Sequence, residues 1–407
     1  MQRTETILMR LGAALLAVFC AASVLRAQAF GANAAAAQVT VDCNRGQSLN
    51  RALAGLDKNV AATVLVKGTC VEAVDVRGFE GLTLNGSGKA TLEAPNQTTD
   101  VVRGVLTISA SRSVTIDGLR VFGGSGQFEG VVIFDGSADV RLRNMTVENG
   151  RHYGIIVTGR SNASLARLTV REPAGWAAVG IYDGSVVHIE DSLIENSNPD
   201  VWHAGIDTDG AVVAILHGIT IRNWAVPLSV RGNSAIKIYD NTDFFPPGGQ
   251  VDVVIENPDG NYVSSAVVVA SSSMLSLGAP LRIVRPVRRM GMREAGLKVN
   301  GGSICLCGGR NLVIEDSQGQ GVLVEGHSQA NLVGATITGA VGNGVVAVDH
   351  STVMLGSAND PDTIISGSLV NDLFCDGTSS IFGLQNAPTG VKVNCDNVQM
   401  GGFPPIP

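Results

Sequence analysis

The sequence predicts an all-β fold, a single-stranded right-handed parallel β-helix of about 10–12 coils with a short N-terminal capping helix. Three observations predict it. The composition is rich in glycine, with 50 residues, and poor in charged (16%) and aromatic (4%) residues, which suits many short strands joined by tight turns. A glycine followed by a short apolar strand recurs about every 25 residues. Two further short apolar stretches follow in each unit, so that one unit makes one coil of three strands.

Residues 1–29 are typical of a secretory signal peptide. Arg3 and Arg10 give a basic start, residues 11–25 are apolar, and residues 27–29 (AQA) supply a cleavage pattern. The apolar run is shorter than the about 20 residues that a spanning helix needs. We therefore expect a mature chain with no membrane span, located in the periplasm or outside the cell. Removal of this segment, whose formal charge is +2, takes the chain from −7 to −9, and so acidic a protein is not expected to bind nucleic acid.

Residues 30–63 are expected to cap the first coil. Leu49, Leu53 and Leu56 recur at helical spacing within residues 47–56. A short amphipathic helix there would cover the open end of the solenoid, where unpaired strand groups are otherwise exposed.

Six cysteines remain in the mature chain, and an even number in an exported protein favours disulfides. The local pairs are Cys43 with Cys70 and Cys375 with Cys395. Cys305 and Cys307 are left unassigned, because a strand would point both to one face, where a direct bond would be strained. Since no histidine or second cysteine pair stands at zinc spacing, we predict no metal.

The β-helix itself is predicted over residues 64–370, followed by a C-terminal cap and tail at 371–407. Its repeat is marked by small anchor residues that precede the first strand of each coil: Gly130, Gly154, Gly180, Gly205, Pro227, Gly296, Gly321 and Gly344. No single unit could bury its own apolar face, whereas units stacked about 4.8 Å apart would share one core.

A family resemblance rests on three elements: the stretch VDCNRGQSLNRAL (41–53), the stretch VLVKGTC (64–70) and the coil repeat. Together they resemble right-handed parallel β-helix proteins of the pectin-lyase-like superfamily, over roughly residues 40–370. The resemblance implies the fold. It leaves the activity open, because the superfamily contains lyases, hydrolases, epimerases, tailspikes and adhesins.

A polar strip is expected on the outer face of the middle coils. If the residue after each anchor points inward, the second and fourth residues point outward. In the middle coils these outward residues are polar, and we predict that the following form the strip: Tyr182, Asp207, Asp209, Ser229, Arg231, Lys298, Asn300 and Glu325. Trp176, Trp202 and Trp224 are 26 and 22 residues apart, so we expect them to form an aromatic column beside the strip.

Aromatic faces combined with carboxylates and cations are the parts of a sugar-binding groove. We therefore predict that the protein binds or processes a polysaccharide, with Tyr182, Trp176, Trp202, Trp224, Asn300 and Glu325 as binding residues. A basic segment before Lys298 favours an acidic, uronate-containing polymer; it contains Arg282, Arg285, Arg288, Arg289 and Arg293. The alternative for these arginines is pairing with neighbouring acids or simple solvation.

The candidates for catalysis are Asp207, Asp209, Arg231, His203 and Lys298. Asp207 and Asp209 stand two strand residues apart, about 6.6 Å between Cα atoms, which leans toward the roughly 6.5–9.5 Å of an inverting glycosidase. DTDG (207–210) is similar to the N-T-D-G element of polygalacturonase-type hydrolases, which implies that Asp209 matches that element's aspartate. A lyase or epimerase would instead use Arg231 and Lys298 as cations that stabilise the anionic intermediate. The carboxylates could bind Ca²⁺, and no other cofactor is expected.

Two alternatives stay open at this point. His203 is either a general acid or base beside the strip or a turn residue. The whole protein is either carbohydrate-active, or a non-catalytic structural or adhesive solenoid whose repeat presents a surface. We expect a monomer, with an oligomer left open.

Overall fold

The computed structural model describes residues 37–96, 104–124, 127–197, 203–211, 213–239, 252–256, 264–285, 294–356, 363–383, 392–395 and 398–399. The chain divides into a short unit, Met1–Gln38, and the unit Val39–Pro407. The predicted signal peptide lies outside the described residues. Among the residues that the structure describes, no helix is long and apolar enough to cross a membrane.

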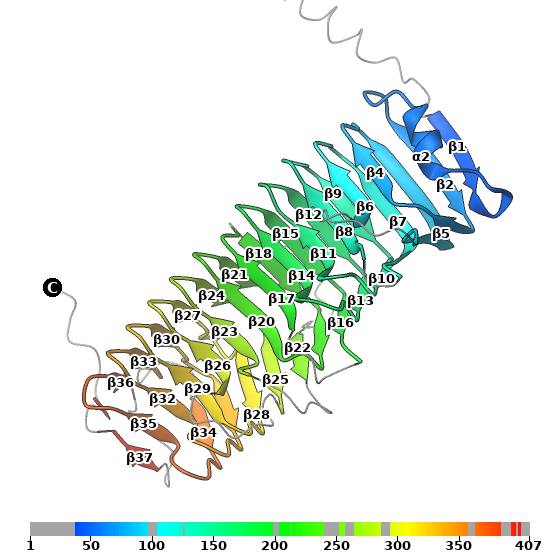
Figure 1. The fold of residues 1–407 in the computed structure, drawn as a ribbon. Helices are drawn as coiled ribbons and strands as arrows, with labels where there is room; N and C mark the ends of the chain where they lie inside the picture. The colour runs from blue at the N-terminus through cyan, green and yellow to red at the C-terminus, as the bar shows by residue number, and fades with distance from the viewer. Residues whose placement is uncertain are drawn as a thin grey trace, which may run out of the picture. The chain divides into compact units, whose positions relative to one another are not determined.

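The unit Val39–Pro407 is a right-handed parallel β-helix, as the repeat predicted (Figure 1). Each full coil contributes one strand to each of three parallel stacks. The first stack, here called sheet 1, has 13 strands among the described residues, which is close to the predicted number of coils. Its strands are β4 (Val74–Arg77), β6 (Gly104–Ser109), β8 (Glu129–Phe134), β11 (Tyr153–Val157), β14 (Ala177–Tyr182), β17 (Ala204–Asp209), β20 (Val226–Arg231), β23 (Val267–Val269), β26 (Ala295–Val299), β29 (Gln320–Val324), β32 (Val345–Ala347), β35 (Leu373–Cys375) and β37 (Val393–Asn394).

The other two stacks, sheets 2 and 3, are joined because β5 and β7 run through both. Sheet 2 contains β1 (Ala37–Asp42), β2 (Ala62–Lys67), β5 (Leu82–Glu93), β7 (Thr115–Phe122), β9 (Val140–Arg143), β12 (Asn162–Ala166), β15 (Val186–Glu190), β18 (Val213–His217), β21 (Ala235–Ile238), β24 (Met274–Leu277), β27 (Ile304–Leu306), β30 (Gln329–Asn331), β33 (Thr352–Met354), β36 (Ser380–Phe382) and β38 (Val398–Gln399). Sheet 3 adds β3 (Thr69–Val71), β10 (Thr146–Glu148), β13 (Thr169–Arg171), β16 (Leu193–Glu195), β19 (Thr220–Arg222), β22 (Val253–Glu256), β25 (Leu281–Val284), β28 (Leu312–Glu315), β31 (Thr336–Thr338) and β34 (Ile364–Ser366).

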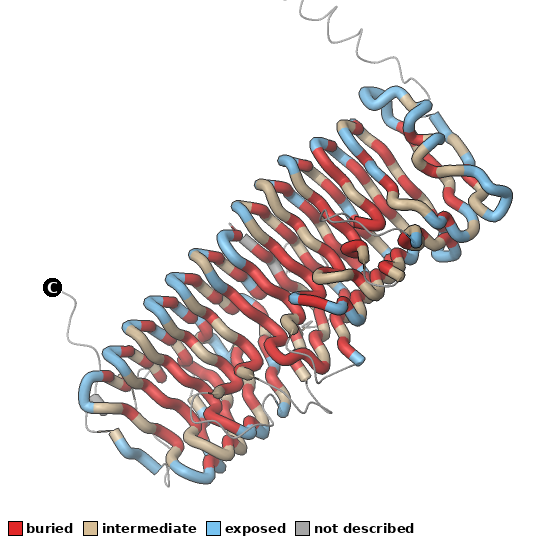
Figure 2. Tube along the Cα trace, in the orientation of Figure 1, coloured by how far each residue is buried: buried red, intermediate tan, exposed pale blue. Residues whose placement is uncertain are grey.

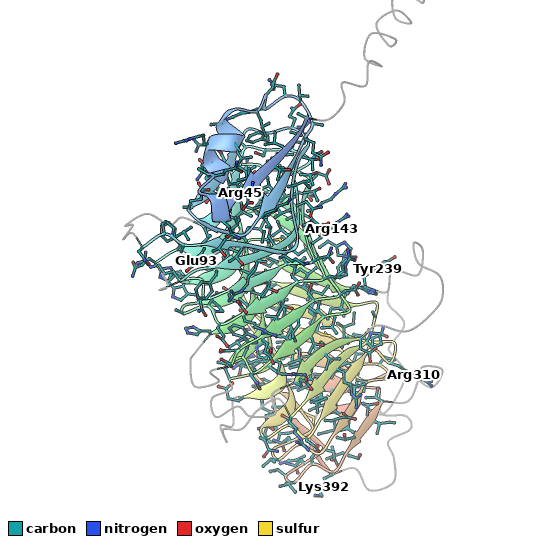
Figure 3. All side chains as sticks on the ribbon, turned by 90° about the vertical axis from the view of Figure 1, so that its right-hand side faces the viewer. Arg45, Glu93, Arg143, Tyr239, Arg310 and Lys392 are labelled. Carbon is teal, nitrogen blue, oxygen red and sulfur yellow. A yellow bond between two sulfur atoms is a disulfide. The ribbon has the colours of Figure 1, made fainter. Side chains whose placement is uncertain are left out.

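The core is a column of stacked aliphatic side chains inside the coils, and Figure 2 shows that buried residues recur in coil after coil. In β15, for example, Val187 and Ile189 are buried while the residues between and beside them are partly exposed. The period of two puts alternate side chains inside, and parallel register places each buried residue on another, such as Val187 on Ala163. Outward side chains such as Arg143 and Tyr239 line the outside (Figure 3).

A ladder of buried serines closes the turn between sheets 1 and 2. At most steps of the ladder the hydroxyl accepts a hydrogen bond from a backbone N–H one coil earlier, as Ser273 does from Ser234 (3.1 Å) and Ser303 from Ser273 (3.2 Å). The ladder satisfies amide groups that would otherwise be buried without a partner. Other turns use left-handed backbone at Asn149 (φ 55°) and Asn223 (φ 60°), which asparagine tolerates.

The predicted capping helix is present, within the described part of residues 30–63. After a 3-10 turn, η1 (Cys43–Arg45), helix α2 (Leu49–Ala54) buries Leu49 and Leu53, and the Ser48 hydroxyl accepts from the Arg51 N–H. Glu72 extends from the coil below and accepts hydrogen bonds from the start of the helix.

The disulfides Cys43–Cys70 and Cys375–Cys395 are present, as predicted. Cys305 and Cys307, which the sequence left unassigned, are also joined. Both are fully buried, and β27 ends at Leu306, between them. The two Cα atoms are 5.4 Å apart, within the range of ordinary disulfides.

Candidate functional site

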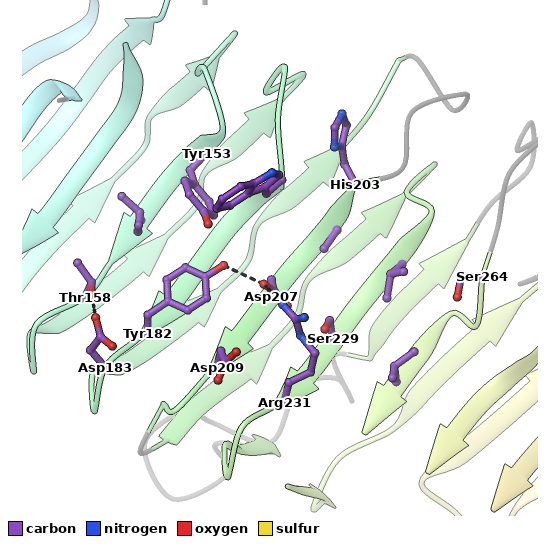
Figure 4. Close-up of a pocket in the computed structure, with 15 residues that line it drawn as sticks. Tyr153, Thr158, Tyr182, Asp183, His203, Asp207, Asp209, Ser229, Arg231 and Ser264 are labelled. Atoms are coloured by element: carbon purple, nitrogen blue, oxygen red, sulfur yellow. Dashed lines mark hydrogen bonds and ion pairs between the residues drawn. The ribbon is translucent and has the colours of Figure 1, made fainter. Parts of the chain in front are cut away.

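A groove of about 900 Å³ lies on the outer face of sheet 1, over the middle coils (Figure 4). We call it the first hollow. The residues that line it come from β11, β14, β17, β20 and β23 and from the turns beside them: Tyr153, Ile156, Thr158, Trp176, Tyr182, Asp183, His203, Ala204, Asp207, Asp209, Val226, Ser229, Arg231, Ser264 and Val268. Part of the predicted polar strip therefore lines a real depression.

The centre of the first hollow is a hydrogen-bonded group of three side chains. Arg231 donates to both oxygens of the Asp207 carboxylate, from Nη2 at 2.9 and 2.7 Å and from Nε at 3.2 Å. The Tyr182 hydroxyl donates to the same carboxylate at 2.8 Å. The Asp207 side chain is only 9% exposed, whereas that of Arg231 is 48% exposed. Both oxygens of this buried carboxylate are thus already engaged.

Strand register explains how Tyr182 reaches Asp207. The sequence prediction put the two side chains in one row, but Asp207 stands beside Gly180, and Tyr182 stands beside Asp209. Because Gly180 has no side chain, the Tyr182 ring leans across it: a Cβ there would lie 2.6 Å from Tyr182 Cε2. The predicted row was wrong because Gly180 is not the anchor of its coil; the register gives that place to Ala178.

Asp209 is exposed, and its carboxylate lies directly against Gly232. Arg231 stands level with Asp209 in the sheet, so position on adjacent strands alone would pair these two residues. The guanidinium instead donates to Asp207, whose buried carboxylate accepts from it with both oxygens. Asp209 still contributes a favourable charge to Arg231.

The protonation of the central group follows from burial. Burial raises the pKa of the Tyr182 phenol far above its usual value, and the negative Asp207 raises it further. Burial likewise raises the pKa of Tyr153. Burial alone would lower the pKa of Arg231, but the hydrogen bonds to Asp207 and the negative charges of Asp207 and Asp209 together outweigh it, and the pKa is raised. Tyr182 therefore remains a hydrogen-bond donor and Arg231 a cation at neutral pH.

Aromatic rings form one wall of the first hollow. Trp176 is 67% exposed, and its ring meets Tyr153 edge-on, with centroids 6.0 Å apart. Tyr153 in turn meets Tyr182 at 5.8 Å. The His152 ring also contacts the indole, with centroids 5.4 Å apart. The exposed indole is thus held by neighbouring rings while its surface stays open to solvent.

The predicted tryptophan column is wrong at Trp224, which is only 1% exposed and whose Nε1 donates to the Ile194 carbonyl in the interior. The register aligns Trp176 with His203 and Ala225, not with Trp224. A shift of one residue turns a side chain to the opposite face. Trp202 lies outside the described residues.

His203 lines the first hollow as expected from its place beside the strip. Its ring points away from Asp207 and Arg231 (Figure 4). Its position next to Trp176 in the adjacent coil makes it part of the rim rather than of the central group.

Lys298, Asn300 and Glu325 lie further along sheet 1. The strand β23 stands between β20 and β26, a coil that sequence reasoning did not count. Lys298 is therefore three strand spacings from Asp207, about 14 Å, and its Nζ pairs with Glu325 at 2.9 Å. It was predicted to act with Arg231, and this distance places it outside the central group.

Among the described residues, none of the arginines of the basic segment (residues 281–296) lines the first hollow. Arg282 lies on β25 in sheet 3 and pairs with Glu315 at 2.9 Å. Arg285 follows it at the end of the same strand. Arg288, Arg289 and Arg293 are outside the described residues.

Sequence reasoning missed Glu129. Its side chain is buried, and it accepts hydrogen bonds from the backbone N–H groups of His152 and Tyr153 and contacts the His152 ring at 2.8 Å. A glutamate directly before an anchor glycine was the available signal. Glu129 fixes the turn that carries His152 and Tyr153, and hence the support of Trp176.

Among the described residues, one group has the spacing of metal ligands: Cys43, Cys70 and Glu72. Its two cysteines form a disulfide, and Glu72 holds the start of α2. These contacts account for the group without an ion.

No family model matches the chain, and no curated protein matches its sequence. Solved structures do. The catalytic unit of a GH87 α-1,3-glucanase from Streptomyces thermodiastaticus strain HF3-3 is 12% identical, with a TM-score of 0.47, over 92% of this chain and 72% of that one. The surface adhesin PfbA of Streptococcus pneumoniae is 10% identical, with a TM-score of 0.30, over 84% of this chain and 90% of that one. At these values the likeness transfers no function, and membership of the pectin-lyase-like superfamily stays a prediction.

Proposed function

We propose that this protein is an exported polysaccharide-binding β-helix, and that the first hollow holds a chain of neutral sugars. The observation that carries the proposal is the exposed Trp176 indole, fixed by aromatic neighbours beside a set of polar side chains. The disulfides favour an oxidising compartment outside the cytoplasm.

The aromatic wall suits the apolar face of a sugar ring. An indole that is 67% exposed and contacts the rings of His152 and Tyr153 loses little side-chain freedom when a ligand covers it. Elsewhere in the same groove, the Asp209 carboxylate and the Thr158–Asp183 pair, joined at 2.5 Å, offer acceptors for sugar hydroxyls. This combination of one apolar platform and a few convergent polar groups is typical of small-molecule sites.

The charge of the first hollow favours neutral over acidic sugars. Its described lining holds three aspartates, Asp183, Asp207 and Asp209, against one arginine and no lysine. Arg231 is already neutralised by Asp207. A uronate would bring further negative charge next to the carboxylates and find no available cation, which costs binding energy.

The central group supports binding better than turnover. Asp207 accepts from Arg231 and Tyr182 with both oxygens, so using it as a base would break these bonds. We propose that it positions Arg231 and Tyr182 in the wall of the groove. Asp209 remains the carboxylate that meets ligand directly.

The test is a binding measurement with neutral and uronate polysaccharides by affinity electrophoresis and calorimetry, with release of reducing or unsaturated ends followed in parallel. Trp176→Ala should weaken binding of a neutral polymer by about tenfold, since losing an aromatic contact costs roughly 1–2 kcal/mol. The matched control is Tyr239→Ala, an aromatic residue that is 46% exposed away from the groove (Figure 3), which should leave binding unchanged.

Three results would contradict the proposal. Preference for uronate polymers would restore the acidic substrate. Release of new chain ends that Asp209→Ala abolishes would make the protein an enzyme. Equal binding by wild type and Trp176→Ala, or none to any polymer, would favour a structural or adhesive solenoid.

A further inference from the structure

A second groove of about 900 Å³ lies on the same face of sheet 1, toward the C-terminal coils. We call it the second hollow. Its lining comes from β29, β32, β35 and β37 and adjoining turns: Asn300, Gly301, Gln320, Leu323, Glu325, Gly326, Gly342, Asn343, Val346, Val348, Asp349, Val370, Asn371, Phe374 and Asn394.

The floor of the second hollow is apolar. Leu323 and Val346 form a small hydrophobic cluster with Ala295, packed against Val348 and Phe374, and this cluster is separate from the core inside the coils. It lies on the outer face of sheet 1, where the middle coils carry Asp207 and Ser229 in the same row. An apolar platform on the outside of a strand stack is not needed to close the solenoid.

Amide side chains form the rim. The Gln320 Oε1 accepts from the Asn343 N–H at 2.5 Å, and the Asn343 Oδ1 accepts from the Asn371 N–H and Nδ2 at 3.1 and 3.0 Å. Gln320 is only 6% exposed. These bonds fix Asn343 and Asn371 in place, so that the rim beside the apolar floor is pre-organised.

The charge of the second hollow resembles that of the first. Its described lining includes Glu325 and Asp349 and neither lysine nor arginine. Glu325 is neutralised by Lys298, and this ion pair stands between the two hollows. An apolar floor, fixed amides and no available cation match a neutral, hydroxyl-rich ligand, as the first hollow does.

The two hollows are in line along one row of the sheet. The register runs from Asp207 through Ser229, Val268 and Lys298 to Leu323, and on to Val346 and Phe374. The strands β17 and β29 are four spacings apart, about 19 Å at 4.8 Å per strand. Figure 1 shows β20, β23 and β26 as the successive strands between them.

We infer that the second hollow is a second sugar site and that one neutral polysaccharide chain occupies both hollows, bridging the two strand spacings, about 10 Å, from β23 to β29. This inference rests on the proposed function of the first hollow. Between the two hollows the chain passes over Lys298 on β26. Because the second binding event is then intramolecular, the gain in affinity comes from chain length rather than from new chemistry.

The experiment is calorimetry of the intact protein with neutral oligosaccharides of defined length, four sugars against about ten, of whichever backbone the protein binds. Each protein molecule should bind two of the short chains or one of the long chains. The long chain should bind at least tenfold more tightly than the short chain. Phe374→Ala should reduce the short-chain stoichiometry to one and remove the gain with the long chain. Asn371→Ala, on the rim, gives a second test that leaves the apolar cluster intact.

The matched control is Phe382→Ala. Phe382 lies on β36, the strand that follows β35 in the chain but belongs to sheet 2, so this variant should bind both chains as wild type does. Normal long-chain affinity in both Phe374→Ala and Asn371→Ala, with loss in Trp176→Ala, would overturn the second site and leave the first intact. Normal binding in Trp176→Ala, or no binding by wild type, would instead overturn the proposed function.

Discussion

The ion pair in the first hollow gives an asymmetric prediction, because its two members are buried to different extents. Arg231→Ala would leave the Asp207 carboxylate, 9% exposed, with the Tyr182 hydroxyl as its remaining described partner. Asp207→Ala would leave the guanidinium, 48% exposed, able to turn toward water. We therefore expect the loss of the arginine to destabilise the fold more than the loss of the aspartate.

The magnitudes follow from these exposures. Breaking a buried pair costs about 3–5 kcal/mol, and the open groove puts Arg231→Ala at the lower end, about 3 kcal/mol. Asp207→Ala should cost about 1 kcal/mol, the value of a partly exposed pair and its hydrogen bonds. The double variant should cost no more than about 1–2 kcal/mol, because it leaves no buried charge behind. The single-variant difference is thus about 2 kcal/mol.

Thermal unfolding followed by circular dichroism measures this difference. For a unit of this length 1 kcal/mol corresponds to about 1–2 °C, so Arg231→Ala should unfold roughly 4 °C below wild type and Asp207→Ala about 1 °C below. Arg282→Ala is the control, since it breaks an exposed pair with Glu315 and should shift the midpoint by less than about 1 °C. An Asp207→Ala variant as unstable as Arg231→Ala would refute the reasoning from burial.

Three further predictions concern the solenoid. Val187→Asp places a charge inside the coil, where Val187 is fully buried, and should prevent accumulation of folded protein, whereas His188→Asp on the outward side of the same strand should fold normally, as judged by soluble yield and circular dichroism. Replacing both Cys43 and Cys70 by serine removes a link across 27 residues and should cost about 3–4 kcal/mol of stability. The measurement is the thermal unfolding midpoint, which should fall; an unchanged midpoint would contradict the prediction. Burial tends to raise the pKa of Asp376, but hydrogen bonds from Asp349, Thr378 and Ser379 outweigh it and lower the pKa from 3.8 to about 2. The ionised carboxylate therefore stabilises the fold above about pH 4, and this stabilisation is lost as the pH falls toward 2. The stability difference between wild type and Asp376→Asn should vanish in acid, and a difference that persists at pH 2 would count against this reasoning.

The fold was predictable because its signal is repeated in every coil. Alternation at Val187 and Ile189, and again at Ile236 and Ile238, marks inward positions that the structure buries. Errors in one coil are corrected by the next, since all coils must share one core. The helix over the first coil was equally readable, because Leu49 and Leu53 stand at helical spacing.

The site was less predictable because it depends on register between particular coils. The anchor position is not restricted to glycine, and alanine occupies it in the coils of β14 and β23, as Ala178 and Ala266. Taking Gly180 as the anchor of β14 shifted Tyr182 by two residues, and the coil of β23 was omitted. A shift of one residue likewise placed Trp224 outside, although it faces the core.

The coil of β23 also sets a length. Each coil adds one strand spacing to the distance between the two hollows, so this distance can change only by whole steps of about 4.8 Å. Insertion of a single coil between β23 and β26 would lengthen the distance between the hollows and leave the coils that line each of them in place. If one polysaccharide chain occupies both hollows, as proposed, duplication of a short stretch of sequence would then change the length of chain that binds best.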